Sequence, residues 1–293
     1  MGAQIASAGR LTVRGATADD AESCGRIFYD AFEALALRHN FPVEAESPEF
    51  ARRVIAMMLG NPEIAGVVAE HDGEVVGSAF ADERGPIAGI GPVSVAPDAQ
   101  DAGVGRALME ALLRRERERQ VAGVRLVQTA YHYRSLALYA KLGFVVREPL
   151  SVLRGKPPAL SVPGVSVRPA DEDDLAACSE LCTRIHGHDR TGELRDAIAA
   201  GGAIVAERPG RISGYATGFG YAWHAVCETN DDLIALIGSA ESFGGLGIVV
   251  PSRNGQLLRW CLDRGLRIAQ QSTLMTIGLY NEPAGAWLPS IAY

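Results

Sequence analysis

The chain lacks both a long hydrophobic run and a surplus of positive charge. None of its apolar stretches approaches the roughly 18 residues needed to cross a bilayer. Residues 1–10 lack the basic start and apolar block of a secretory signal. The net charge of −7 provides no basic surface for nucleic acid or an anionic membrane. We therefore predict a cytoplasmic protein with neither membrane nor nucleic acid as a partner, and the acidic balance suits a cationic or amine-bearing substrate.

Cysteine is scarce and shows no pairing pattern. Its number is odd and no two cysteines form a CxxC pair; the five are Cys24, Cys178, Cys182, Cys227 and Cys261. This predicts reduced, mostly buried thiols and argues against a disulfide framework. His186 and His188 have no acid or cysteine at a fixed ligand spacing, so we predict no metal site.

The length and composition indicate a folded protein with more than one domain. The chain has 293 residues, of which 47% are hydrophobic and 22% charged. This balance is typical of a globular protein with a well-developed core. A chain of this length exceeds what one core usually fills, so two domains are expected.

A faint internal duplication supports the two-domain prediction. Each copy has a strand leading into an Asp-Asp helix start, then a hairpin with a glycine turn, then a helix that stops at glycine. The matched segments are Leu11–Cys24 with Val165–Cys178, Gly66–Ala79 with Ala203–Ala216, and Leu138–Phe144 with Trp260–Leu266. The spacing between them is shorter in the second copy, which we interpret as a reduced version of the first.

The segment between the copies contains glycines and prolines that interrupt both helical and strand periodicity. We therefore predict a first domain at residues 1–150, a linker at 151–164 and a second domain at 165–293.

Hydrophobic periodicity in the first copy predicts an α/β fold. Mixed antiparallel hairpins followed by a βαβ crossover imply a twisted, mostly antiparallel sheet flanked by helices. The expected strands are 11–13, 67–70, 75–82, 90–95, 124–129 and 144–148, and the expected helices are 19–39, 48–59, 105–120 and 135–142.

The most informative segment runs from Val93 to Arg106, where a strand enters a glycine-bearing loop that opens a helix. Gly103 and Gly105 remove Cβ atoms that would keep an anion away. Their N–H groups lie at a helix N-terminus, where the macrodipole favours negative charge. The pattern predicts a nucleotide-type cofactor, although the glycines could also form only a tight turn.

Two motifs at this separation resemble the GNAT superfamily of acyl-CoA N-acyltransferases. One is the Gln100-x-x-Gly103-x-Gly105 loop after a Val-x-Val-x-Pro strand, and the other is Ser135–Phe144. The resemblance covers about residues 10–150, and the second half only through the repeat. It implies a tandem pair of GNAT-like domains, the second degenerate.

The resemblance also implies how acetyl-CoA binds. Asp101 to Arg106 would cradle the pyrophosphate, and the strand would offer backbone groups to the pantetheine arm and the thioester. The residues implied in cofactor binding are Val93, Ser94, Val95, Gln100, Asp101, Ala102, Gly103, Val104, Gly105, Arg106 and His132.

Tyr139 is the residue that the resemblance implies as general acid. A tyrosine in this helix commonly protonates the departing CoA thiolate in the family. Tyr139 also follows the helical spacing of Leu136 and Leu142, so a core aromatic is the alternative. His132 stands where the family often has asparagine, and it could donate the same hydrogen bond, act as a base or have no role.

The sequence does not identify a general base. Asp82 and Glu83, at the end of the strand before the cofactor strand, are candidates. Solvated turn carboxylates before Gly85 are the more ordinary interpretation.

The second copy departs from the first at the cofactor positions. Its counterpart of the phosphate loop, Val226–Asp232, has no glycine and three acids, so we predict that it does not bind acyl-CoA. Cys261 takes the place of Tyr139, most simply as a packing residue, and Asn254 takes the place of His132. The apolar tail, residues 285–293, is expected to dock rather than extend into solvent.

Together these features predict an enzyme, an N-acetyltransferase that moves an acetyl group directly from acetyl-CoA to a primary amine of a small molecule or peptide. The protein is expected to be a monomer or homodimer. The alternatives are a non-catalytic acyl-CoA sensor and a transferase of a longer acyl group.

Overall fold

The computed structural model describes residues 11–291. The prediction about residues 1–10, and the part of the tail prediction that concerns residues 292 and 293, therefore lie outside the described residues. The first copy contains strands β1 (Leu11–Gly15), β2 (Ile64–His71), β3 (Glu74–Asp82), β4 (Ile87–Val95), β5 (Gly123–Thr129) and β6 (Val145–Arg154). Its helices are α1 (Ala21–His39), α2 (Pro48–Gly60), α3 (Val104–Glu118) and α4 (Tyr133–Lys141). Every strand and helix predicted for this copy is present, with boundaries shifted by a few residues.

The second copy repeats this order with mostly shorter elements and adds a final strand. Its strands are β7 (Ser166–Pro169), β8 (Ile204–Arg208), β9 (Arg211–Ala216), β10 (Ala225–Cys227), β11 (Ile248–Pro251), β12 (Arg267–Gly278) and β13 (Ala286–Leu288). Its helices are α5 (Leu175–His186), α6 (Thr191–Ala199), α7 (Asn230–Ser239) and α8 (Gly255–Asp263). Short 3₁₀ turns at Ala18–Asp20, Pro97–Ala99 and Glu172–Asp174 complete the described elements.

The two copies share an ion-paired corner at their first strand. Arg14 at the end of β1 donates two hydrogen bonds of 2.8 Å to Asp20, whose carboxylate also caps the turn at Thr17. In the second copy Arg168 binds Asp174 in the same way, at 2.7 and 2.8 Å. The repeated Arg and Asp residues of the sequence therefore perform the same structural role twice.

The strands form two sheets, and the larger one contains strands from both copies. Its order is β1-β2-β3-β4-β5-β12-β6-β11, and the smaller sheet has the order β13-β10-β9-β8-β7. All described pairs are antiparallel except β4 with β5. The mixed, mostly antiparallel sheets confirm the predicted fold class.

The centre of the large sheet shows an exchange of strands between the copies. The equivalent strands β6 and β12 pair with each other, and β12 lies between β5 and β6 while β6 lies between β12 and β11. Strand β6 also continues through residues 151–154, which the sequence analysis placed in the linker. The hydrophobic run in this segment pairs with β11 and β12, which is why it extends the strand.

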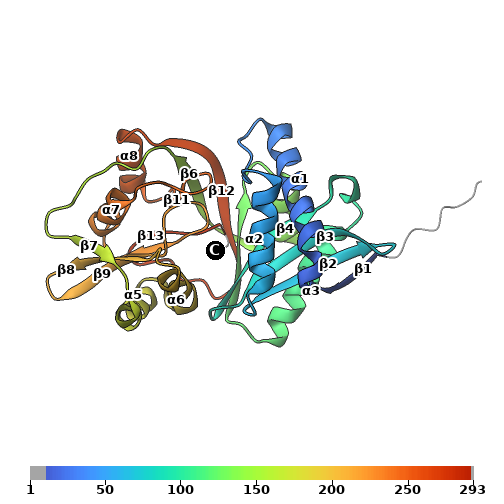
Figure 1. The fold of residues 1–293 in the computed structure, drawn as a ribbon, viewed down its shortest axis with the longest axis horizontal. Helices are drawn as coiled ribbons and strands as arrows, with labels where there is room; N and C mark the ends of the chain where they lie inside the picture. Colours follow the sequence, from blue (N-terminus) through green and yellow to red (C-terminus); the bar gives the residue numbers. More distant parts are fainter. Residues whose placement is uncertain (1–10, 292–293) are drawn as a thin grey trace, which may run out of the picture.

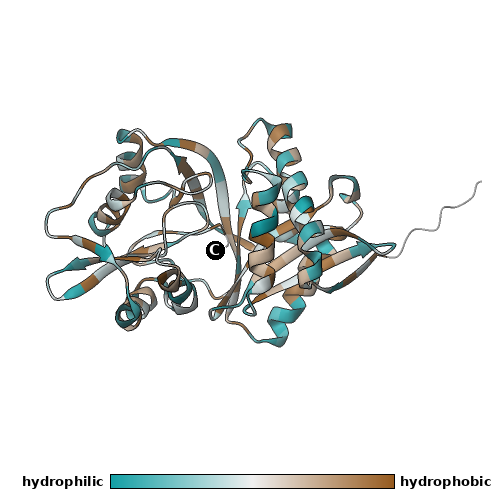
Figure 2. Cartoon of the chain, in the orientation of Figure 1, coloured by the Kyte–Doolittle hydropathy of each residue, from teal (hydrophilic) through white to brown (hydrophobic). Residues whose placement is uncertain are grey.

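The two lobes lie side by side, with β12 passing along their boundary (Figure 1). Helices α1 and α2 cover one face of the large sheet, where Cys24 and Ile55 pack with Phe80 of β3. Helix α3 covers the other face through Leu108 and Leu112. Hydrophilic and apolar segments alternate along α1 and α2 in Figure 2, as expected for helices with one buried face.

All five cysteines are buried and free, which confirms the prediction from their spacing.

The tail is docked as predicted as far as it is described, since β13 pairs with β10 and the Ile291 N–H donates to the Tyr221 carbonyl at 2.8 Å. Within residues 11–291, the helices are too short or too polar to span a bilayer.

Candidate functional site

The most open feature of the large sheet is the divergence of β4 and β5. These parallel strands pair only from Ile87 opposite Gly123 to Gly89 opposite Arg125 within the described residues. Beyond that point the edge of β4, including Val93, Ser94 and Val95, faces away from β3 without a strand from β5. Such an edge can accept an extended amide-bearing arm as an additional strand.

The glycine loop follows directly at the open end of this divergence. Gly103 is the N-cap of α3 with φ of 83°, a left-handed conformation that favours glycine. A Cβ on Gly103 would meet nothing within 4 Å, whereas one on Gly105 would lie 3.6 Å from Leu138 and 3.7 Å from Val95. The helix N-terminus and its free N–H groups therefore lie beside an open space next to β4.

Polar contacts hold the loop against its surroundings. The Gln100 side-chain amide donates to the Val95 carbonyl at 3.3 Å, which ties the loop to the end of β4. Arg134 of α4 forms an ion pair with Asp101, which has a positive φ of 69°. This pair offsets a carboxylate that would otherwise repel an anion at the loop.

Tyr139 lies on α4 and packs partly into the core beneath α3. Its ring centroid is 5.9 Å from that of Phe144, and it borders the cluster that contains Leu108 and Leu112. Burial raises the pKa of Tyr139 to about 12, so its hydroxyl is protonated throughout the physiological range. The site thus provides a protonated phenol, while the ring also has the packing role suggested by its helical spacing.

His132 is the N-cap residue of α4, the position that Asn254 holds on α8. Burial, followed by the nearby Arg134, lowers the pKa of His132 to about 4. The Gln128 side chain donates to the His132 carbonyl at 2.9 Å. His132 is therefore a neutral imidazole at the mouth of the β4 and β5 divergence.

The predicted cofactor residues occupy consecutive positions around this opening. The Ser94 side chain is buried on the sheet, so only its backbone faces the site, and Val104 is buried at the start of α3. Asp101, Ala102 and Gly103 are exposed in the loop. Arg106 borders a hollow of about 390 Å³ between α3 and α4 that is also lined by Arg114, Arg117 and Lys141. Glu110 also lines this hollow and lies 3.4 Å from Arg106, so its surface is mixed in charge with an excess of positive groups.

The structure places the two candidate bases in ion pairs. Asp82 binds Arg84 through several hydrogen bonds, one of them 2.9 Å long. Glu83 lies 2.5 Å from Arg115 and 3.4 Å from Arg119. Burial by itself would raise the pKa of Glu83, but the hydrogen bond from Arg115 outweighs it and the pKa is lowered. Neither carboxylate is arranged to take a proton from a substrate.

A further carboxylate, Glu44, lies in the loop between α1 and α2. Its Oε1 accepts hydrogen bonds from Gln270 at 2.9 Å, Tyr221 at 3.1 Å and Thr129 at 3.3 Å. Burial raises the pKa of Glu44 even though these three donors act to lower it. No local pattern marks this residue, because its partners come from distant parts of the chain.

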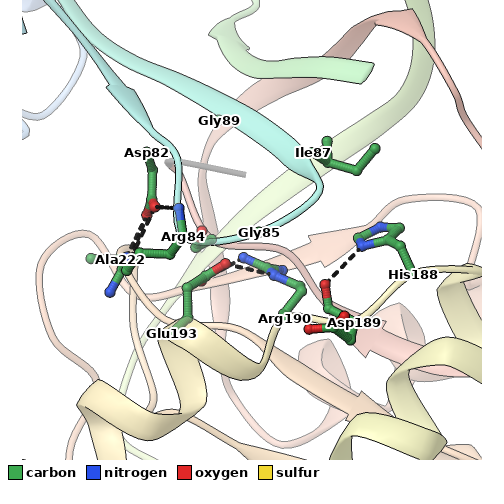
Figure 3. A pocket seen from close by; sticks show the side chains of 11 residues that line it. Asp82, Arg84, Gly85, Ile87, Gly89, His188, Asp189, Arg190, Glu193 and Ala222 are labelled. Atoms are coloured by element: carbon green, nitrogen blue, oxygen red, sulfur yellow. Dashed lines mark hydrogen bonds and ion pairs between the residues drawn. The ribbon is translucent and has the colours of Figure 1, made fainter. Parts of the chain in front are cut away.

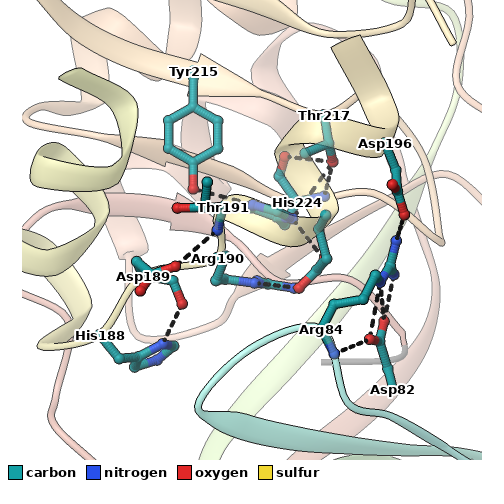
Figure 4. Close-up of polar contacts among 11 residues, drawn as sticks. Asp82, Arg84, His188, Asp189, Arg190, Thr191, Asp196, Tyr215, Thr217 and His224 are labelled. Atoms are coloured by element: carbon teal, nitrogen blue, oxygen red, sulfur yellow. Dashed lines mark hydrogen bonds and ion pairs between the residues drawn. The ribbon is translucent and has the colours of Figure 1, made fainter. Parts of the chain in front are cut away.

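A polar network joins the lobes at the other end of β4. Figure 3 shows the turn after β3 facing the start of α6. Arg84 of this turn forms a 2.7 Å ion pair with Asp196, further along the same helix (Figure 4). Arg190 binds Glu193 at 2.7 Å, as Figure 3 shows, and Glu193 lies 3.1 Å from His224. The cavity here has a volume of about 40 Å³. It has room for a few waters but not for a substrate, so we interpret the network as a connection between lobes.

The second copy fills its corresponding cofactor site with its own residues. Thr229 and Asp232 form a capping box at the start of α7, and Asp232 also accepts 2.7 Å and 2.9 Å bonds from Arg208 and Ser213. Strand β13 pairs with β10, the counterpart of β4. Burial raises the pKa of Cys261 to about 12, which fits packing rather than nucleophilic chemistry. Within residues 11–291, no three His, Cys, Asp or Glu side chains are grouped as a metal site would require.

An opened sheet with a glycine loop and helix N-terminus at its mouth defines the class of acyltransferases that use acyl-CoA. Residues 28–144 match the model of the acetyltransferase (GNAT) family. The match identifies a GNAT acetyltransferase domain in the first copy, and the whole chain shares the fold of a tandem GNAT protein. No curated protein matches the chain at a significant level.

Solved structures share the fold over nearly the whole chain. A protein from Pyrococcus horikoshii with a provisional acetyltransferase assignment is 22% identical, with a TM-score of 0.69 over 93% of this chain and 91% of that one. A GCN5-related N-acetyltransferase from Sphaerobacter thermophilus is 17% identical, with a TM-score of 0.61 over 93% and 96%. A tandem GNAT protein of the clavulanic acid biosynthesis pathway is 16% identical, with a TM-score of 0.56 over 92% and 98%.

Proposed function

We propose that this protein is an N-acetyltransferase that transfers an acetyl group directly from acetyl-CoA to a primary amine. The observation that carries the proposal is the unpaired edge of β4 ending at the N-terminus of α3. In this arrangement the pantetheine arm adds to β4 as a strand, and the pyrophosphate binds the N–H groups after Gly103. Val93 and Val95 supply the backbone groups near the thioester.

Tyr139 is proposed as the general acid. Its pKa of about 12 keeps the proton on the phenol until charge develops on the CoA sulfur. Because a free thiol has a pKa near 8.5, complete transfer from a phenol of higher pKa is uphill, so the expected contribution is modest. Most of the rate enhancement would come from orientation of the amine and the thioester.

We propose that the chain consists of two duplicated units joined by a linker. The predicted bounds are 1–150, 151–164 and 165–293, and the first unit extends to the end of β6 at residue 154. The first unit binds the cofactor, and the second completes the sheet and shapes the acceptor side. We also propose a cytoplasmic location, which the five buried free thiols support.

The test is a calorimetric titration with acetyl-CoA, combined with thiol release in the presence of a panel of primary amines. Saturable binding and amine-dependent release of CoA are expected. Binding without release for any amine would contradict catalysis, and failure to bind would contradict the assignment of the β4 edge.

A further inference from the structure

Glu44 lies near the part of the sheet, around Val93 of β4, where the thioester is proposed to bind. The last paired residues of the diverging strands are Gly89 on β4 and Arg125 on β5. Four residues further along each strand are Val93 and Thr129. Thr129 donates to Glu44 at 3.3 Å, so this carboxylate lies beside the end of β5. Strand β4 shifts register against β3 between Ile90 and Val93, which places Val93 near this level.

The carboxylate approaches from the face of the sheet opposite α3. On β5, Val124 and Leu126 pack toward α3, whereas Val127 belongs to the cluster formed with Tyr221 and Trp287 of the second lobe. Thr129 follows the alternation of Val127 and points to the same side. A cofactor bound at α3 and an acceptor reaching Glu44 would therefore meet from opposite faces of the sheet.

One oxygen of Glu44 is held and the other is available. All three described hydrogen bonds go to Oε1, and Oε2 has no partner within residues 11–291. Glu44 is only half-buried, and Oε2 is the oxygen left to meet a small polar group. The Gln270 side chain that orients Glu44 is buried, and its own Oε1 has no hydrogen-bond partner among the described residues.

The loop that carries Glu44 is fixed on the end of β5 by an aromatic stack. The rings of Phe41 and Tyr131 are 4.0 Å apart at an interplanar angle of 7°. Together with the three donors, this stack fixes the carboxylate without a cationic partner among the described residues. The lack of a paired cation distinguishes Glu44 from Asp82 and Glu83.

From this geometry we propose that Glu44 is the catalytic base, taking a proton from an acceptor amine that enters as the ammonium ion. The inference rests on the proposed function and deepens it. Oε2 forms a bond to one ammonium proton, which frees the nitrogen lone pair to attack the thioester carbon. The C–N bond forms, the nitrogen loses a second proton to water, and the C–S bond breaks. The sulfur takes the proton of Tyr139, which water replaces, and Glu44 returns its proton to solvent.

The test compares Glu44→Gln with the matched control Glu46→Gln, an exposed residue two positions along the same loop. The wild-type protein is first screened against primary amines with acetyl-CoA, and the amine that releases most thiol becomes the probe. For each variant we would measure acetyl-CoA affinity, thermal stability, and kcat/KM for that amine from pH 6 to 10.

We expect Glu44→Gln to lower kcat/KM for the amine by about 100-fold or more at pH 7, with acetyl-CoA affinity within twofold of wild type. The loss should shrink as the pH approaches the pKa of the amine, because the free base then no longer requires deprotonation by the protein. Glu46→Gln should match wild type throughout. Partial recovery of a Glu44→Ala variant by added formate would further support the assignment.

Other outcomes overturn the inference in distinguishable ways. A Glu44→Gln variant with the wild-type rate and pH profile would leave acetyl transfer intact and remove only the role of Glu44. A pH-independent loss accompanied by weaker acetyl-CoA binding would show that Glu44 is structural. If the wild-type protein binds acetyl-CoA but acetylates no amine, the proposed function fails and this inference fails with it.

Discussion

The buried side chain of Gln270 donates a 2.9 Å hydrogen bond to Glu44, joining residues 226 positions apart in the sequence. Glu44 belongs to the first copy and Gln270 to the strand that the second copy inserts between β5 and β6. The same glutamine donates to Tyr221 at 3.0 Å. The carboxylate assigned to catalysis is thus positioned largely by the half of the chain that lacks a glycine loop.

The exchanged strands predict that the first half cannot fold alone. A fragment of residues 1–164 lacks β12, so both β5 and β6 would expose unpaired edges and the apolar face that Met275 covers. We expect this fragment to be insoluble or unfolded by circular dichroism, and to be rescued by co-expression with residues 165–293. A soluble, folded fragment that binds acetyl-CoA would contradict this view of the sheet.

Replacement of Tyr139 tests the general acid. Tyr139→Phe keeps the ring packed against Phe144 and removes only the hydroxyl. We expect kcat to fall about 10- to 100-fold, while acetyl-CoA affinity by calorimetry remains within twofold. The control is Tyr133→Phe on the same helix, whose side chain is 73% exposed. Equal losses of kcat and affinity in Tyr139→Phe would indicate a packing role alone.

Backbone conformation at Gly103 is predicted to control cofactor binding. Alanine at φ of 83° is strained by roughly 1–2 kcal/mol, and the loop can relieve this only by moving its N–H groups. We expect Gly103→Ala to weaken acetyl-CoA binding about tenfold, as measured by calorimetry. Gly73→Ala, with φ of 87° in the turn between β2 and β3, is the matched control. It should lose similar stability in urea unfolding without any change in affinity.

The titration should give one acetyl-CoA site per chain. In the second copy the Asp232 carboxylate and Arg208 fill the start of α7, and β13 covers the edge of β10. To bind a second phosphate group, the chain would have to break the 2.7 Å ion pair between Asp232 and Arg208. Strand β13 would also have to separate from β10. A measured stoichiometry of two would show that this copy retains a functional site.

The Arg14 and Asp20 corner predicts a specific dependence of stability on pH. The hydrogen bond from Arg14, opposed by burial, lowers the pKa of Asp20 from its usual 3.8 to about 2. A lowered carboxyl pKa contributes stability above pH 4 that is lost as the pH falls toward 2. Because Arg14 is 40% exposed, we expect Asp20→Asn to cost about 1 kcal/mol at pH 7, less than the full shift implies.

Urea unfolding of Asp20→Asn and wild type at several pH values measures this difference. The difference in free energy of unfolding between wild type and Asp20→Asn should approach zero near pH 2. The control variant Asp19→Asn, at an exposed neighbouring position, should have nearly the stability of wild type at every pH. A constant difference between pH 7 and pH 2 would exclude the ion pair as its source.

The sequence by itself determined the features that depend on short segments. Helical and strand periodicity, the turn at Gly103 and the repeated Arg and Asp corners are encoded within about 15 residues, so the duplication, the elements and the place of the glycine loop were predictable. Only the tertiary structure decided which strands are neighbours. The insertion of β12 beside β5, and hence the meeting of Glu44 with Gln270, depends on pairing between distant segments. Alternating apolar residues show that a strand is buried on one face, but they do not identify its partner.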